Sequence, residues 1–163
     1  MFYRHVPITL VPILIAIFFV GGLVGKIYLG RLTDKYSNTT VFIACEAGMA
    51  IALVVIAHTT SLFPFALISF ILGVLTKGTV PAAVTMASES VEKDGGYEHA
   101  YSFNFIFVSL ATMLTPPLLG LVADHINITF SFYVCAIAAL LAILPALLFR
   151  KKKLLSEANL LNK

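Results

Sequence analysis

Long, uninterrupted runs of apolar residues dominate the pattern of this chain, and they predict membrane-spanning helices. Between charged or turn-forming breaks, five such runs cover about residues 6–30, 40–57, 62–87, 100–122 and 129–149. A helix needs about 20 apolar residues to cross the hydrocarbon core of a bilayer, and each run reaches or approaches that length. We therefore predict an all-α, multi-pass integral membrane protein with five transmembrane helices in a single membrane domain over residues 1–163.

The composition supports this interpretation and argues against most soluble functions. Of the 163 residues, 60% are hydrophobic and only 12% are charged, about half the charged fraction of a soluble domain. Five membrane helices with short connections leave no room for an extramembrane domain. Cys45 and Cys135 both lie inside apolar runs, which argues against a disulfide framework or a thiol metal site.

The positions of the basic residues predict the orientation of the helices, because Lys and Arg in short loops collect on the cytoplasmic side. The connections at residues 58–61 and 124–127 contain neither Lys nor Arg. The alternate connections and the C-terminal end carry Arg31, Lys35, Lys93, Arg150, Lys151, Lys152 and Lys153. We expect the N-terminus outside and the C-terminus in the cytoplasm. An outside N-terminus without a preceding signal indicates that helices upstream are missing.

Closely spaced glycines and a charged segment stand at the end of the first predicted helix. Gly21 and Gly25 form a Gly-x-x-x-Gly pair, which lets another helix approach closely in lipid. Taken alone, the pair is best explained by ordinary helix packing, and we expect Gly21 and Gly25 to serve that purpose. The six residues that follow Leu29, Gly30-Arg31-Leu32-Thr33-Asp34-Lys35, place several charges at the predicted membrane edge.

This six-residue segment resembles the loop signature of the major facilitator superfamily, G-x-x-x-D-[RK]-x-G-[RK]-[RK]. In that family the signature joins helices 2 and 3 and recurs in weaker form between helices 8 and 9. Gly30, Asp34 and Lys35 match it, whereas residues 37–39 lack the second glycine and the two further basic residues. The resemblance implies that Gly30, Arg31, Asp34 and Lys35 form a loop that controls conformational switching.

A second resemblance involves the fourth predicted helix. Facilitator halves are built from three-helix repeats related by inversion. Gly120 and Asp124 end the fourth helix with the same spacing as Gly30 and Asp34, 90 residues later, and we expect Gly120 to take part in helix packing. Residues 116–120 also resemble the family's Gly-Pro-x-x-Gly-Gly stretch of helix 5, which is echoed in helix 11.

Two placements in the facilitator fold are open, helices 2 to 6 and helices 8 to 12. We favour helices 8 to 12, because the chain ends soon after the basic residues 150–153 and the third helix lacks the arginine motif expected of helix 4. The resemblance implies part of a secondary active transporter that moves a small solute by alternating access, driven by a proton or sodium gradient. The missing N-terminal helices and the lipid bilayer would be its partners. The alternative is a truncated, non-functional remnant or a structural membrane subunit.

If this placement holds, the resemblance implies that the first, third and fourth helices face the central cavity. The polar residues of the third and fourth helices are then the candidates for substrate contact. These are Lys77, Asn104, Thr112 and Thr115. A lysine near the bilayer centre costs about 2.5–3.5 kcal/mol in lipid, so it must face water or a partner. An anionic solute or an acidic partner would keep it charged. The alternatives are a lysine that reaches toward the headgroups, and hydrogen bonds between helices for the other residues.

The remaining polar residues indicate no catalytic chemistry. Glu46 is the only acid deep in the second predicted helix, and we favour a structural pairing with Lys26 or Arg31 over a proton-coupling role. The sequence offers no catalytic triad, metal site or cofactor motif. The basic residues 150–153 are typical of a topology anchor on anionic lipid, not of nucleic-acid binding.

Overall fold

The structure, a computed structural model, describes residues 8–91 and 97–161, without the side chains of residue 8, Asp34, residues 89–91, 97 and 100, and residues 152–161. Its elements are η2 (Ile8–Leu10), α1 (Val11–Lys35), α2 (Asn38–His58), α3 (Leu62–Val91), α4 (Tyr97–His125) and α5 (Ile128–Leu161). Each of these five α-helices is long and apolar enough to cross a membrane. The predicted all-α membrane fold is therefore confirmed.

Helix α1 extends beyond its apolar run. The segment at residues 30–35, expected to be a loop, forms the end of the helix, and two residues separate it from α2. Thr33 Oγ1 donates a hydrogen bond to the Gly30 carbonyl oxygen at 2.6 Å, and the Tyr36 N–H donates to the Leu32 carbonyl oxygen at 2.9 Å. Charged side chains end a hydrophobic pattern, but they leave backbone hydrogen bonding intact, so the helix continues past the apolar run.

The same reason applies to α5, which continues past the basic residues 150–153 to Leu161. At about 1.5 Å per residue, its 34 residues extend over roughly 50 Å. This is well beyond the roughly 30 Å of a hydrocarbon core. The apolar part that fits a span covers Ile128–Lys151.

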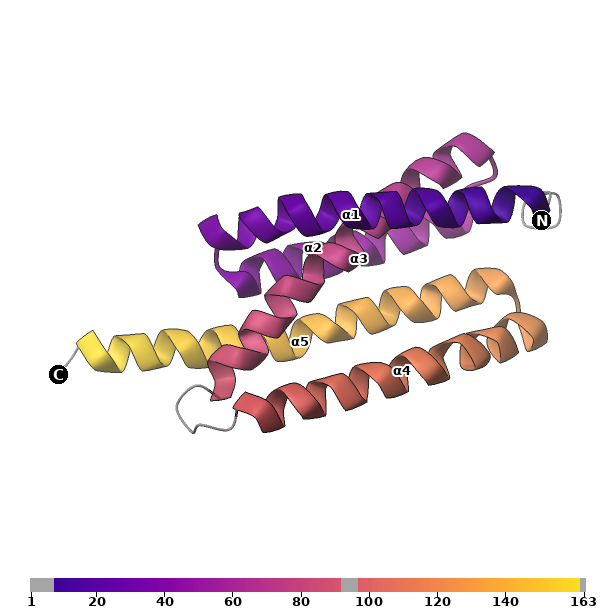
Figure 1. The fold of residues 1–163 in the computed structure, drawn as a ribbon. Coiled ribbons are helices and arrows are strands. Elements are labelled where there is room, and N and C mark those ends of the chain that lie inside the picture. The colour runs from indigo at the N-terminus through magenta and orange to yellow at the C-terminus, as the bar shows by residue number, and fades with distance from the viewer. Residues whose placement is uncertain (1–7, 92–96, 162–163) are drawn as a thin grey trace.

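Helices α1 and α3 pack against each other through glycines. A Cβ added to Gly21 would overlap the Phe70 carbonyl group, and one added to Gly25 would overlap the backbone of Val74. Because these contacts advance in the same direction on both helices, α1 and α3 run parallel. Figure 1 shows α3 crossing obliquely from the neighbourhood of α1 and α2 toward the start of α4. Close backbone contact of this kind is a main source of helix association in lipid.

Helix α2 contacts both α3 and α5. Its residues Ala52 and Ile56 form a buried cluster with Leu72 of α3. At the end of α2, the His58 imidazole contacts α5, where its Nε2 lies 3.1 Å from the Tyr133 hydroxyl, while its Nδ1 lies 3.0 Å from the Val54 carbonyl oxygen. This polar contact joins α2 to α5 near the connection between α2 and α3.

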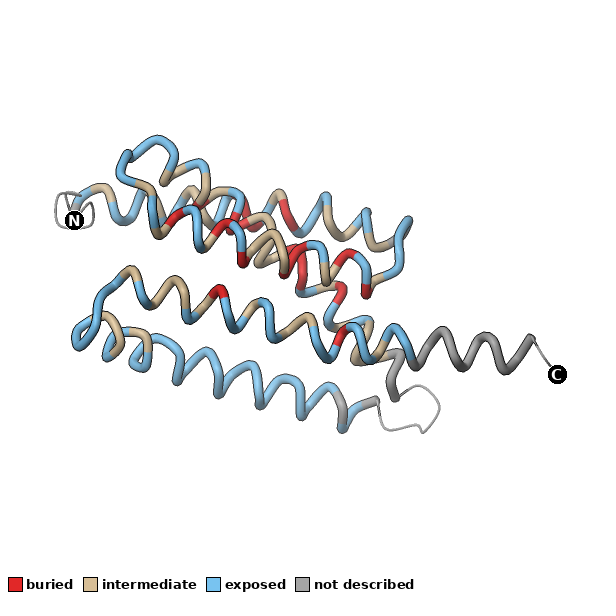
Figure 2. The backbone as a smooth tube through the Cα atoms, turned by 180° about the vertical axis from the view of Figure 1, so that it is seen from behind, coloured by how far each residue is buried: buried red, intermediate tan, exposed pale blue. Residues whose placement is uncertain are grey.

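Helix α4 is much less covered than the others. Every described side chain from residue 101 to residue 118 is exposed, and Figure 2 shows the helix in pale blue over most of its length. Near its C-terminal end it meets α5, where the Ser131 hydroxyl donates to the Leu119 carbonyl oxygen at 3.3 Å. An apolar helix with this exposure has a long face available for lipid or for further helices.

Candidate functional site

Lys77 lies on α3 and packs against α1. Its side chain is half-buried, and it covers Gly22 of α1, so that a Cβ built on that glycine would lie 2.7 Å from the lysine Cγ and 3.4 Å from its Cβ. Among the described residues, no hydrogen bond or ion pair involves its ammonium group. An unpaired ammonium in a membrane-spanning helix requires water or an anionic partner from outside the described chain.

The backbone around Lys77 is also irregular in its hydrogen bonding. Pro81 lies inside α3 and has no N–H, so the Lys77 carbonyl oxygen, four residues earlier, loses its usual intrahelical donor. The nearby hydroxyl of Thr76 instead donates within the helix to the Leu72 carbonyl oxygen at 2.6 Å, and that of Thr79 donates to the Thr76 carbonyl oxygen at 2.9 Å. The Thr76 hydroxyl also lies 3.4 Å from the Met49 sulfur of α2. Both hydroxyls therefore have described partners, whereas the Lys77 ammonium has none among the described residues.

The candidates on α4 form a separate group. Thr112 and Thr115 line an open depression of about 610 Å³ together with Val108, Ala111, Pro116 and Leu119. All of these residues belong to α4, so the depression is one face of a helix and not a space enclosed between helices. The Thr112 hydroxyl donates to the Val108 carbonyl oxygen at 2.7 Å. Asn104 is exposed, and neither it nor Lys77 lines this depression.

The motif at the end of α1 faces outward. Arg31 and Lys35 are exposed, and a Cβ added to Gly30 would meet no described atom within 4 Å. The side chain of Asp34 lies outside the part of the chain that the structure describes. At Gly120, expected to pack against another helix, an added Cβ would also meet open space among the described residues. Gly30 and Gly120 are thus alike, because a side chain at either position would meet no described atom of another element.

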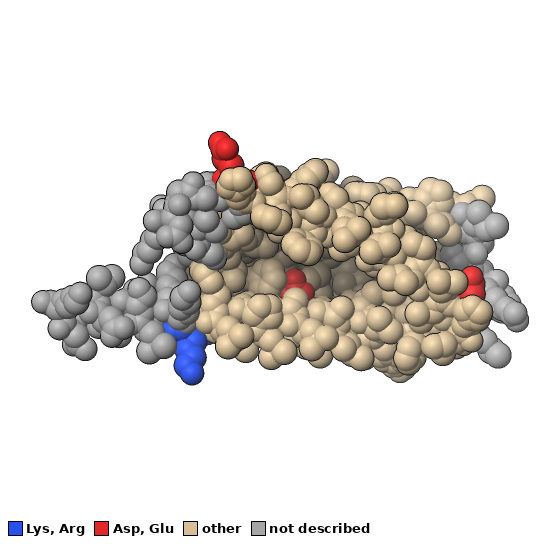
Figure 3. All heavy atoms as spheres, turned by 90° about the horizontal axis from the view of Figure 1, so that it is seen from below, with Lys and Arg blue, Asp and Glu red and all other residues tan. Residues whose placement is uncertain are grey.

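Glu46 on α2 is buried, with 8% of its surface exposed, whereas Lys26 and Arg31 are exposed. Within the described residues no ion pair joins Glu46 to either of them, so the expected structural pairing is absent there. The other described acids, Glu98 and Asp124, lie near the two ends of α4. Figure 3 shows an acidic side chain inside a hollow on one face of the molecule, surrounded by residues that are neither acidic nor basic.

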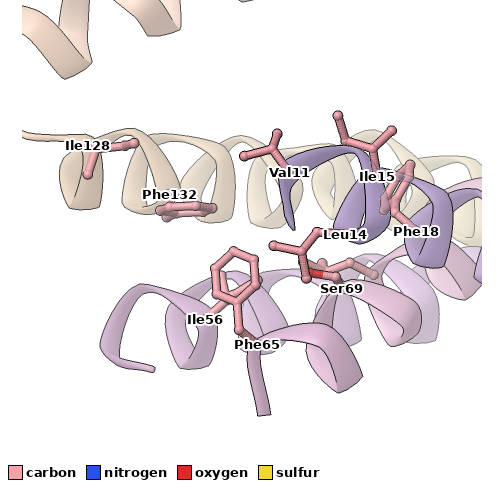
Figure 4. A pocket seen from close by; sticks show the side chains of 10 residues that line it. Val11, Leu14, Ile15, Phe18, Ile56, Phe65, Ser69, Ile128 and Phe132 are labelled. Carbon is pink, nitrogen blue, oxygen red and sulfur yellow. The ribbon is translucent and has the colours of Figure 1, made fainter. Parts of the chain in front are cut away.

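An apolar pocket lies where four helices meet. Its volume is about 530 Å³, and α1, α2, α3 and α5 all contribute to its lining. Figure 4 shows Phe65 and Phe132 beside the pocket, with Ile56, Leu14 and Ser69 close by. Ser69 supplies the only hydroxyl among the ten lining residues. This pocket was not predicted from the sequence, because its residues come from segments more than 100 positions apart and look like ordinary apolar helix residues.

Metal binding has no candidate group in this part of the chain. Among the described residues, no group of three or more His, Cys, Asp and Glu side chains could hold a metal ion. The geometry therefore leaves three features for function: an unpaired lysine against a glycine of α1, a buried acid on α2, and a polar face on the exposed helix α4.

Comparison with known proteins shows which family the chain resembles. The profile of the Major Facilitator Superfamily matches residues 2–162. Monocarboxylate transporter 9 of Pongo abelii is 33% identical over 132 residues, covering 76% of this chain and 25% of that protein. The protein of the same name from Gallus gallus is 33% identical over 120 residues, covering 71% of this chain and 22% of that protein.

A bacterial relative is more distant. The uncharacterized MFS-type transporter YuxJ of Bacillus subtilis (strain 168) is 24% identical over 130 residues, which cover 80% of this chain and 33% of that protein. The chain thus spans about a fifth to a third of the length of these relatives. No solved structure matches it.

Proposed function

We propose, on the premise that this chain belongs to the Major Facilitator Superfamily, that it forms part of a secondary active transporter that moves a small solute by alternating access. The observation that carries the proposal is the family match over residues 2–162, on a chain with five helices suited to span a membrane. Its relatives are named as transporters, which supports a transport function over an enzymatic one.

Further helices complete the transporter in this proposal. The exposed face of α4 supports it, because a helix that is uncovered from residue 101 to residue 118 has room for a neighbouring helix. The chain also spans a minor share of its relatives. We place the chain at helices 8 to 12 of the family and the missing helices before it, with Thr112 and Thr115 on the cavity face.

The solute we propose is a small anion that carries a carboxylate. Two relatives are named monocarboxylate transporters, and the ammonium of Lys77 has no partner among the described residues. A carboxylate would satisfy that ammonium through a charge-assisted hydrogen bond, which is stronger than a hydrogen bond between neutral groups. Asn104 and the two threonines would add weaker polar contacts.

A coupling ion, proton or sodium, would drive this transport. Glu46 is the described acid that is best shielded from solvent, and a carboxylate in that position binds a proton or a cation more favourably than it stays unpaired in the membrane. We therefore propose Glu46 as the candidate for coupling, in place of the structural pairing expected from the sequence.

Uptake of radiolabelled lactate by cells that express this chain together with the helices that complete the transporter tests the proposal. Lys77→Ala should lower uptake at subsaturating lactate by about tenfold or more, because a hydrogen bond to a charged group is lost. Lys77→Arg should keep much of the uptake if a fixed positive charge is sufficient. The exposed Lys151 at the end of the α5 span provides the control, and Lys151→Ala should transport normally.

Equal uptake by the wild type and Lys77→Ala at equal surface expression would contradict the role of Lys77 and favour a lysine that reaches the headgroups. If the wild type itself transports no tested solute, the structural-subunit or remnant alternative becomes the better explanation. Both readings require that membrane insertion of each variant is measured in the same cells.

A further inference from the structure

The glycines between α1 and α3 differ in what a side chain at each position would meet. At Gly21, Gly25 and Gly73 an added Cβ would overlap backbone atoms of the other helix. Larger residues there force the helices apart. At Gly22 the atoms met first belong to the side chain of Lys77, and the nearest backbone atom is the Gly73 carbonyl oxygen at an ordinary 3.7 Å. Gly22 therefore makes room for the Lys77 side chain more than for the contact between the two helix backbones.

The contact with Gly22 determines the direction of the Lys77 side chain. Its Cβ and Cγ lie directly over the glycine, at distances where a methyl group on α1 would collide with Cγ. A lysine side chain has several rotatable bonds and loses conformational freedom when it is held in one course. Contact with the backbone of α1 at Gly22 removes part of this freedom before any solute binds. The direction of the Lys77 side chain is therefore fixed as far as its Cγ.

We infer that Gly22 is the positioning residue for Lys77, and that it presents the lysine ammonium to the carboxylate of the transported solute. This inference rests on the proposed function, in which Lys77 contacts that solute. Alanine at position 22 displaces the lysine side chain while it leaves the α1–α3 backbone contact in place, since no backbone atom is met closer than 3.7 Å.

Two measurements on the transporter test the inference. The first is the KM for lactate uptake of Gly22→Ala, which should rise about tenfold or more with a smaller change in kcat, because a misdirected ammonium loses its contact with the carboxylate. Gly48→Ala is the matched control. It adds the same methyl group on α2, where the nearest atoms are the ends of the Leu75 side chain at 3.2 and 3.6 Å, and it should leave the KM unchanged.

The second measurement does not depend on transport. Membranes are treated with acetic anhydride, and acetylation of each lysine is quantified by mass spectrometry. Gly22→Ala should change the acetylation of Lys77 severalfold, whereas the exposed Lys26 and Lys151 in the same molecules should react as in the wild type. Equal labelling of Lys77 in both proteins would overturn the inference.

The outcomes separate this inference from the proposed function. If Lys77→Ala raises the KM and Gly22→Ala does not, Gly22 has no positioning role. If neither substitution raises the KM but Gly22→Ala changes the labelling of Lys77, Gly22 does position the lysine. In that case the proposed contact between Lys77 and the solute is wrong. If Gly22→Ala does not accumulate, the double variant with Lys77→Ala should restore accumulation, because the colliding side chain is gone. Failure to restore it would also overturn the inference.

Discussion

Lys77 and Glu46 are charged residues inside the membrane-spanning helices, and their surroundings differ. Lys77 is half-buried against Gly22 of α1, and Glu46 on α2 has 8% of its surface exposed. Unpaired charge inside a membrane is costly, so such residues are usually functional. A flexible lysine can reach an aqueous cavity from a half-buried position. The side chain of Glu46 is shorter, so the packing around α2 decides which ions can reach its carboxylate. This contrast supports solute contact for the lysine and ion coupling for the acid.

The motif at the end of α1 supports a prediction for Asp34. In the family, the equivalent acid engages a helix end of the opposite half, where the positive end of a helix dipole favours a carboxylate. Asp34→Asn should therefore keep membrane insertion and lower transport, because the amide carries no charge. Surface biotinylation and lactate uptake by the complete transporter check this prediction. Unchanged uptake by Asp34→Asn at normal surface expression would refute the role taken from the family.

At the scale of elements, the five helices differ in how they pack against their neighbours. α1 and α3 associate through backbone contact at glycines, α2 packs against α3 through a buried apolar cluster, and α4 is mostly uncovered. Close backbone contact depends on the absence of a side chain, so it is sensitive to single substitutions. Packing between apolar side chains tolerates more change, because neighbouring residues can adjust.

This difference predicts the effect of valine at two glycines. Gly25→Val should destabilise the α1–α3 contact by about 1–3 kcal/mol or more, because the new side chain would overlap the Val74 backbone. Gly120→Val is the matched control, since a Cβ there meets no described atom within 4 Å. Thermal unfolding of the chain in detergent, followed by the loss of monodisperse protein, measures both.

A lower unfolding temperature for Gly25→Val with an unchanged value for Gly120→Val is the expected result. Equal destabilisation by the two substitutions would contradict the expectation that a side chain at position 120 meets open space. Equal stability would contradict the close α1–α3 contact itself.

At the scale of the whole molecule, the positions of the basic residues predict the orientation. Ser37 lies between α1 and α2, and Thr60 lies between α2 and α3, and both are exposed. With Cys45 and Cys135 replaced, a Ser37→Cys variant should resist a membrane-impermeant thiol reagent in intact cells, and a Thr60→Cys variant should react. Permeabilised cells provide the control, in which both should react. The reverse pattern in intact cells would contradict a cytoplasmic C-terminus.

Much of the fold could be predicted from the sequence, because the hydrophobic pattern responds directly to the bilayer. Five apolar runs that are about long enough to cross the hydrocarbon core predict five spanning helices, however these helices are arranged. The ends of the helices were less predictable. Charged residues ended the apolar runs at positions 30 and 149, yet α1 continues to Lys35 and α5 to Leu161, since hydrogen bonding within a helix does not require apolar side chains.

The candidate site depended on the tertiary structure to a greater extent. By itself the sequence determined the membrane class, the number of spans, the resemblance to the facilitator family and the choice of Lys77 as a candidate. Only the tertiary structure decided that Lys77 covers Gly22, that Glu46 has no ion pair with Lys26 or Arg31 among the described residues, and that an apolar pocket forms among four helices. Contact between helices depends on their relative rotation and offset, and hydrophobic patterns that are apolar on every side of a helix carry no record of either.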